Sequence, residues 1–257
     1  MPSRSLVLVF VLLASSASAQ IATDRPGFGF SPLVVDRGTV QVEAGLPQAS
    51  RLNFVSLDVG IGGSATTYSF PVLLRYGVTD AVEIRLGSSV YDVIDVSVAP
   101  PNTDFGSSNG NPGLDVIEVG AKIQLATNGP IIALLPSVLI PTTEANDIGA
   151  AVRAIAGWSL SPTVGLTTIL GATYANGEPD AIIVGEAVAV LGTSLTDALS
   201  VYAELAAFTS ENATPVFGGG GLTFLVTPDV QLDASFDLGL TDEAENLLLG
   251  AGASIRF

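Results

Sequence analysis

The sequence contains no cysteine and no histidine. The absence of cysteine excludes a disulfide framework and a lipid-anchored cysteine, so packing and hydrogen bonds must hold the fold. The absence of histidine excludes Ser-His hydrolysis, the common zinc sites and other imidazole chemistry. We therefore expect no enzyme activity, no cofactor and no metal site.

Basic residues are also scarce, with nine Lys and Arg against 25 Asp and Glu and a net charge of −16. Proteins that bind nucleic acid need a basic surface to displace counterions from phosphate. A nucleic-acid partner is therefore excluded. Only 13% of the residues are charged, whereas 48% are hydrophobic.

Long apolar runs are missing beyond the first 20 residues, although the mean hydropathy is +0.54. A membrane-spanning helix needs about 18 or more apolar residues. The most apolar internal stretch, residues 131–140, is interrupted by Pro136 and followed by Pro141. High hydropathy without helical spans favours strands that present apolar side chains to lipid.

The first residues have the features of an export signal. Arg4 supplies the charged end, residues 6–13 the apolar core, and Ala17-Ser18-Ala19 the small-residue cleavage site. We therefore expect residues 1–19 to be a signal peptide that is removed after export.

The last 28 residues show the strand pattern most clearly. From Val230 to Leu240, apolar residues alternate with polar residues and glycine without a miss, and residues 247–257 repeat the alternation up to Phe257. Alternation with a period of two is typical of a strand with one apolar face. It fits a membrane barrel with apolar residues outside or a soluble sandwich with apolar residues inside.

Five tight turns alternate along the chain with six longer polar connections, which we expect to be loops at about residues 47–64, 92–113, 142–147, 175–180, 209–215 and 241–245. Such asymmetry is typical of outer-membrane barrels, with short periplasmic turns and longer extracellular loops. The sequence predicts an all-β, antiparallel up-and-down transmembrane barrel over residues 38–257, with about twelve strands. We expect the strands at residues 39–46, 66–76, 81–91, 114–126, 130–140, 148–159, 163–174, 181–191, 199–208, 216–226, 230–240 and 247–257.

Residues 23–45 carry a more specific signal. Thr23-Asp24-Arg25-Pro26 is followed by Ser31-Pro32 and then by the strand Gly38-Thr39-Val40-Gln41-Val42-Glu43-Ala44-Gly45. This order resembles the start of the bacterial outer-membrane transporter family associated with the meta pathway of phenol degradation. The resemblance implies an outer-membrane barrel that passes small, often hydrophobic or aromatic, solutes. The final Phe257 resembles the C-terminal signal read by the barrel-assembly machinery.

If the apolar rows face the lipid of the outer membrane, the polar rows face the lumen. The expected lumen-lining charged residues are Glu43, Arg75, Glu83, Arg85, Glu118, Lys122, Arg153, Glu204, Asp233, Asp237 and Arg256. Two roles are open for them. In the first, Glu83, Arg85, Glu118 and Lys122 pair on adjacent strands and stabilise the wall. In the second, the charges edge a pore and select solutes.

Residues 20–37 precede the first strand and hold two prolines and two glycines within seven residues, a composition typical of irregular structure. With Arg25, Phe28 and Phe30, this N-terminal segment is a candidate plug in the lumen or a lid at its periplasmic mouth. A disordered leader is the alternative. Two expected strands, residues 130–140 and 181–191, are apolar on both faces, so the sequence does not orient them.

Three functions follow from these observations. The first is an outer-membrane channel for the passive passage of small solutes. The second is a structural or adhesive barrel with a closed lumen. The third, an outer-membrane enzyme, is the weakest, because no histidine is available as a base.

Overall fold

A computed structural model of the protein describes residues 21–46, 48–56, 61–99, 105–112, 116–142, 148–175 and 181–257. The expected signal peptide lies outside these residues. Within them, no helix is long and apolar enough to cross a membrane.

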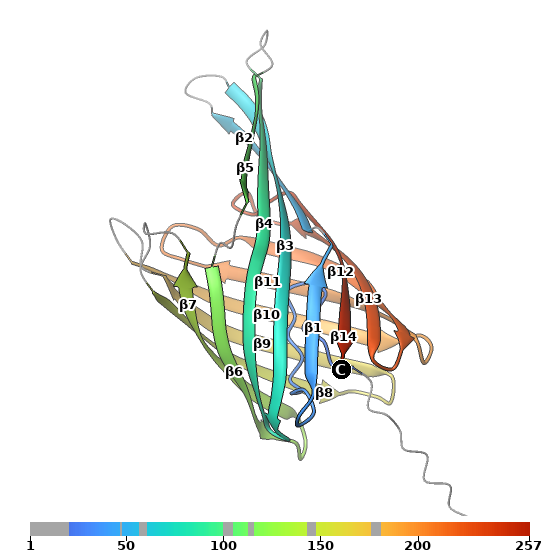
Figure 1. Cartoon of the computed structure of the whole chain (residues 1–257). Helices are drawn as coiled ribbons and strands as arrows, with labels where there is room; N and C mark the ends of the chain where they lie inside the picture. Colours follow the sequence, from blue (N-terminus) through green and yellow to red (C-terminus); the bar gives the residue numbers. More distant parts are fainter. Residues whose placement is uncertain are drawn as a thin grey trace, which may run out of the picture.

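The described residues form one antiparallel sheet that closes on itself into a barrel (Figure 1). Its strands are β1 (Val40–Gly45), β2 (Gln48–Ser56), β3 (Ile61–Thr79), β4 (Val82–Ala99), β5 (Phe105–Pro112), β6 (Val116–Ala126), β7 (Ile131–Pro141), β8 (Gly149–Ser159), β9 (Val164–Ala175), β10 (Ile182–Ser194), β11 (Leu199–Thr209), β12 (Val216–Thr227), β13 (Val230–Gly239) and β14 (Leu247–Arg256).

The barrel closes where its first strand meets its last. β1 pairs with β14 on one side and with β3 on the other, and β2 pairs with the same two neighbours nearer the loop end. β1 and β2 therefore act together as one barrel strand, and β5 is an extra strand paired to the upper part of β4. The predicted twelve-stranded antiparallel barrel is confirmed.

The prediction of loops at residues 47–64 and 92–113 is wrong. β2 and β5 lie in these stretches, and β3 and β4 extend into them, with 19 and 18 residues. The four strands form a blade that projects beyond the barrel rim (Figure 1). β5 is rich in Ser, Asn and Gly and lacks clear alternation, so the blade depends on pairing between its strands, such as Tyr68 with Val93 and Val93 with Gly110.

The two faces of the wall differ as alternation predicts. On β13, Leu232, Phe236 and Leu238 point outward and stay 45 to 48% exposed. Their neighbours Gln231 and Asp233 point into the lumen and are buried. The barrel thus presents apolar side chains to lipid and encloses polar ones, which excludes the soluble sandwich.

Part of the lumenal wall is nevertheless apolar. A buried cluster runs along the inner face from β7 to β12 and reaches the β13–β14 loop; its members are Ala133, Leu135, Ile155, Ile169, Val188, Ala206, Phe217 and Ala244. The structure thereby orients the two strands that were apolar on both faces, with Leu135 of β7 and Val188 of β10 pointing inward. The lumen has a charged side and an apolar side.

Candidate functional site: an N-terminal segment across the lumen

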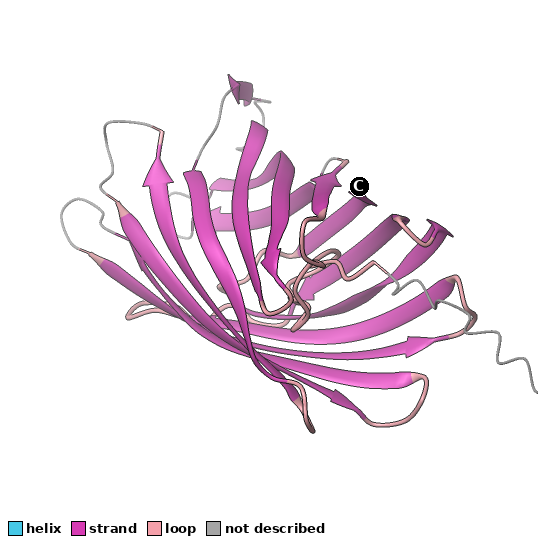
Figure 2. Cartoon of the chain, turned by 60° about the horizontal axis from the view of Figure 1, so that its bottom comes forward, coloured by secondary structure: helices cyan, strands magenta, loops and turns pink. Residues whose placement is uncertain are grey.

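The N-terminal segment runs inside the ring of strands rather than below it (Figure 2). Between Ala22 and Val35 it contacts β1, β3, β4 and β6 on the charged side. It also contacts β11, which lies across the ring from β4, and β13, which is separated from β1 by β14 alone. The segment therefore spans the lumen from wall to wall.

Asp24 is the main charged contact of the segment. Its carboxylate accepts hydrogen bonds from Lys122 Nζ at 2.9 Å and from Arg85, and lies 3.8 Å from Arg75 Nη1. Two wall carboxylates, Glu43 and Glu83, complete the group. We call these residues the Asp24 cluster: Asp24, Glu43, Arg75, Glu83, Arg85 and Lys122.

The Asp24 cluster is electrically neutral only when the N-terminal segment is in place. The wall supplies three cations but only two carboxylates, and Asp24 provides the third negative charge. All six side chains are at most 8% exposed. Buried charges are stable only when they are paired and hydrogen-bonded. The N-terminal segment thus completes a buried network that the wall alone leaves positive.

Arg75 and Lys122 also bind the backbone of the segment. Arg75 donates to the carbonyl oxygens of Ala22 at 2.7 Å and Leu33 at 3.2 Å. Lys122 Nζ donates to the carbonyl oxygen of Ser31 at 2.8 Å. These bonds hold two stretches of the segment, so it is folded back on itself over the cluster.

The pKa of Asp24 follows from these contacts. Burial alone would raise the pKa of this carboxyl, but the charges of Arg75, Lys122 and Arg85 outweigh burial and lower it below its usual range. A carboxyl with a lowered pKa contributes docking free energy above its undocked pKa and loses it only as the pH falls through the docked value. Asp24 therefore stays ionised well into the acid range.

A second set of contacts lies on β11, β13 and β14. Arg25 pairs with Asp233 at 3.2 Å and donates to the carbonyl oxygen of Ala251 at 2.9 Å. The backbone N–H of Phe28 donates to Glu204 Oε2 at 3.0 Å. The Arg25–Asp233 pair is a charge-assisted bond, which is stronger than a neutral one, and the Phe28 bond to β11 fastens the segment across the lumen.

The two phenylalanines of the segment meet the apolar side of the lumen. The Phe28 ring lies 5.3 Å from the Phe208 ring and 5.2 Å from the Phe217 ring, measured between centroids. Phe30 lies beneath the guanidinium groups of Arg153 and Arg85, at 5.1 and 5.6 Å from its centroid. Such contacts add to apolar burial by about 0.5–1.5 kcal/mol for an aromatic pair.

The structure divides the expected lumen-lining residues into groups. Glu43, Arg75, Glu83, Arg85 and Lys122 meet in the Asp24 cluster. Glu204 lies buried on β11, and Asp233 and Asp237 lie buried on β13.

Glu118 and Arg256 lie apart from both groups. In one of the two roles considered, Glu118 pairs with Glu83, Arg85 and Lys122; in the structure it pairs instead with Arg153, at 3.2 Å across β7. Arg153 also binds Glu186 at 2.9 Å. Arg256 sits at the turn end, where it binds Asp229 at 2.7 Å.

Asp24, the residue that balances the charge of the wall, was not among the residues expected to line or plug the lumen. It lies in the Thr23-Asp24-Arg25-Pro26 motif, beside Arg25, which was singled out. The signal that could have found it was the excess of cations over anions expected on β3, β4 and β6. Only a structure shows that the missing anion comes from outside the wall.

Cavities lie on both sides of the segment. Towards the loop end, one of about 360 Å³ borders Phe28 and Asp237, and another of about 530 Å³ borders Asp24 and Glu118. Towards the turn end, there are cavities of about 360 and 320 Å³. Among the side chains that the structure describes, no group of His, Cys, Asp or Glu is arranged to hold a metal ion.

Replacing Gly77 with alanine is expected to displace the end of the segment. A Cβ on this inward-facing β3 residue would collide with the backbone of Val35 and Asp36, which has no flexible end to move. Hydrogen exchange measured by mass spectrometry should rise in residues 33–37. Gly87→Ala is the matched control, because a Cβ there meets Leu73 at an ordinary 3.5 Å. Equal exchange in both variants would contradict the placement of this end.

Comparison with known proteins supports the fold. The family profile described as "Putative MetA-pathway of phenol degradation" matches residues 23–257. A search of curated protein sequences gives no match.

Solved outer-membrane barrels are similar in structure. An outer membrane channel from Pseudomonas putida F1 has a TM-score of 0.61 and 12% identity, over 87% of this chain and 97% of that one. The NanC porin has a TM-score of 0.56 and 8% identity, over 81% and 98% of the two chains. The translocator domain of the autotransporter NalP from Neisseria meningitidis has a TM-score of 0.55 and 12% identity, over 87% and 90%. At these identities the likeness shows the fold alone.

Proposed function

The chain belongs to the family described as "Putative MetA-pathway of phenol degradation", and on this premise we propose that it is an outer-membrane channel for small solutes whose lumen the N-terminal segment closes. Passage is passive and follows displacement of the segment. The observation that carries the proposal is a segment that spans a lumen with cavities on both of its sides.

The way the segment is held supports a removable closure. In the described part of the chain, every hydrogen bond between residues 22–35 and the wall involves at least one side chain. Such contacts break without opening the backbone ladder of the barrel, whereas a plug strand paired into the sheet would not leave so readily. The barrel can therefore persist while the segment moves.

The proposed solutes are hydrophobic or aromatic compounds. The family description refers to phenol degradation. The apolar side of the lumen, from Leu135 to Phe217, offers a surface on which such molecules leave water at a gain of about 25 cal/mol per Å². The Asp24 cluster lies on the other side of the lumen, on β1, β3, β4 and β6, and carries fixed charges of both signs.

Deleting residues 22–35 tests the proposal. We expect the intact protein, reconstituted in liposomes, to pass small solutes slowly and the shortened protein to pass them at least ten times faster. The measurement is release of entrapped solute, with the heat-dependent gel shift of folded barrels as the check on folding. A shortened barrel that is folded but passes no solute would overturn the proposal.

A structural or adhesive barrel with a closed lumen is the second candidate. It is favoured by the blade of β2, β3, β4 and β5, which projects from the loop end as a binding surface would (Figure 1). On this alternative, deletion of the segment leaves the barrel closed and removal of the blade abolishes binding to an outside partner.

We also propose that the C-terminal strand is read during assembly. Phe257 ends the outward apolar row of β14 and is 75% exposed. Its backbone pairs with Val40, the first residue of β1, and so lies at the seam where the barrel closes. A folding catalyst that holds this strand would act at the last pairing to form.

A further inference from the structure

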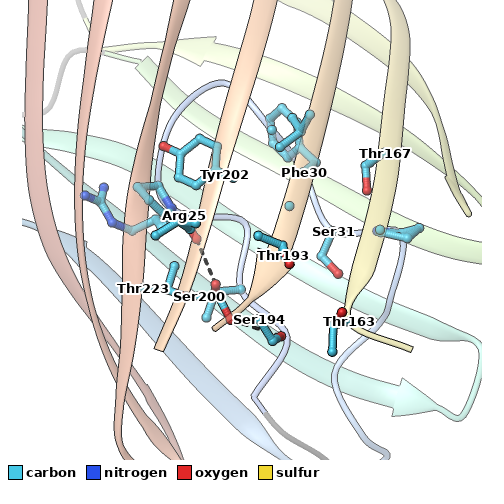
Figure 3. Close-up of a pocket in the computed structure, with 18 residues that line it drawn as sticks. Arg25, Phe30, Ser31, Thr163, Thr167, Thr193, Ser194, Ser200, Tyr202 and Thr223 are labelled. Carbon is cyan, nitrogen blue, oxygen red and sulfur yellow. Dashed lines mark hydrogen bonds between the residues drawn. The ribbon is translucent and has the colours of Figure 1, made fainter. Parts of the chain in front are cut away.

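The turn-end cavity of about 360 Å³ differs from the rest of the lumen in its chemistry. It lies between residues 23–32 of the N-terminal segment and the inner faces of β9 to β12 (Figure 3). Hydroxyl side chains surround it, among them Thr163, Thr167, Ser194, Ser200 and Thr223. We call this cavity the hydroxyl chamber.

One charged residue, Arg25, is among those that line the chamber. Its Nη2 donates to Asp233 and to the carbonyl oxygen of Ala251, so its charge is balanced by Asp233, while its buried Nε has no protein partner among the described residues. Apolar surface comes from Phe30, Pro32 and Val190. A neutral solute with both an apolar face and a polar group matches this lining.

We propose that the hydroxyl chamber binds a neutral single-ring aromatic alcohol, of which phenol is the simplest, with the ring on the Phe30 and Val190 side and the hydroxyl on the threonine side. The inference deepens the proposed function and rests on it. A hydroxyl group both donates and accepts, so a wall of Ser and Thr pairs with it in several orientations. A hydrocarbon of the same size would leave those groups without a partner.

The size and the wall of the chamber agree with this ligand. A cavity of about 150 Å³ in another protein binds benzene, so the chamber holds one ring with its substituent. Two glycines leave space within it. A Cβ on Gly165 would meet nothing nearer than 3.7 Å, and one on Gly192 nothing nearer than 3.9 Å. A larger side chain at Gly192 therefore fills the chamber without breaking the wall.

Calorimetric titration of the purified full-length barrel in detergent tests the inference, with phenol and toluene as probes. We expect saturable phenol binding that is about five- to tenfold tighter than toluene binding, the ratio set by one additional hydrogen bond. In Thr167→Val with Thr223→Val, the preference should disappear. Gly192→Ile should weaken the binding of both probes. Thr67→Val, which changes a hydroxyl in a loop-end cavity, is the control and should leave the preference intact.

Different results would contradict the proposed binding site and the proposed channel. Equal binding of phenol and toluene, no saturable binding, or displacement of phenol by the sugar xylose would overturn the chamber. Phenol binding with the expected variant effects, but no solute release after deletion of residues 22–35, would overturn the channel and leave the chamber as a binding site. Phenol and toluene binding are measured for both the Thr→Val variant and the Gly192→Ile variant. If one of them misfolds, the other still tests the binding site.

Discussion

Replacing Asp24 with asparagine is expected to raise the open probability of the barrel in planar bilayers by about two orders of magnitude. The change leaves Arg75, Arg85 and Lys122 buried with only Glu43 and Glu83 as partners. Removing one member of a buried ion-pair network costs about 3–5 kcal/mol, and the N-terminal segment avoids that cost when it leaves the lumen. The populations of docked and released segment shift accordingly.

Asp36→Asn is the matched control for this prediction. Asp36 belongs to the same segment and pairs with Arg256 at 3.7 Å, but its side chain is 70% exposed. An exposed pair contributes about 0–1 kcal/mol, so the current should stay at the level of the unchanged protein. An Asp24→Asn barrel that stays as closed as the Asp36→Asn barrel would show that the charge of Asp24 does not hold the segment.

Replacing Phe236 with arginine is expected to destabilise the folded barrel in lipid by about 2–4 kcal/mol, the cost of an arginine on the lipid face near the bilayer centre. Phe236 lies within β13, points outward and is 48% exposed. The free energy of unfolding from phospholipid vesicles, measured by urea titration, reports the loss.

Leu240→Arg provides the comparison. Leu240 is also outward and 58% exposed, but it follows the last residue of β13 at the rim. Arginine near the interface costs about 0–1 kcal/mol. If both variants lose the same free energy, the outer face of β13 is not in the bilayer.

The sequence was sufficient for the wall because alternation is a local property. Along β13, each outward residue is apolar and inward residues include Gln231 and Asp233, so the period of two assigns both faces. The same reasoning placed Arg75 and Lys122 in the lumen. It failed for β5, whose sequence FGSSNGNP has no apolar period and becomes a strand only by pairing with β4.

The position of the N-terminal segment could not be predicted in the same way. Arg25 and Asp233 are 208 residues apart in sequence, and no pattern in either strand or segment specifies their contact. The partner of Glu118 could not be predicted for a related reason. Adjacent strands suggested a group with Glu83, Arg85 and Lys122 as one of two roles, whereas the long Arg153 side chain reaches Glu118 from β8. Contacts across a lumen depend on barrel curvature, which alternation does not report.

A disulfide between the segment and the wall tests most directly whether movement of the segment opens the lumen. A Cβ on Gly29 would lie 3.8 Å from the Cβ of Val190, the separation of about 3.8 Å that a disulfide requires. The chain has no other cysteine to compete.

The measurement is the current through a barrel that carries Gly29→Cys, Val190→Cys and Asp24→Asn, recorded before and after a reducing agent is added. We predict a closed barrel while the disulfide is intact and an open one after reduction. A current that is already high in the cross-linked barrel, or that reduction leaves unchanged, would contradict closure by the N-terminal segment.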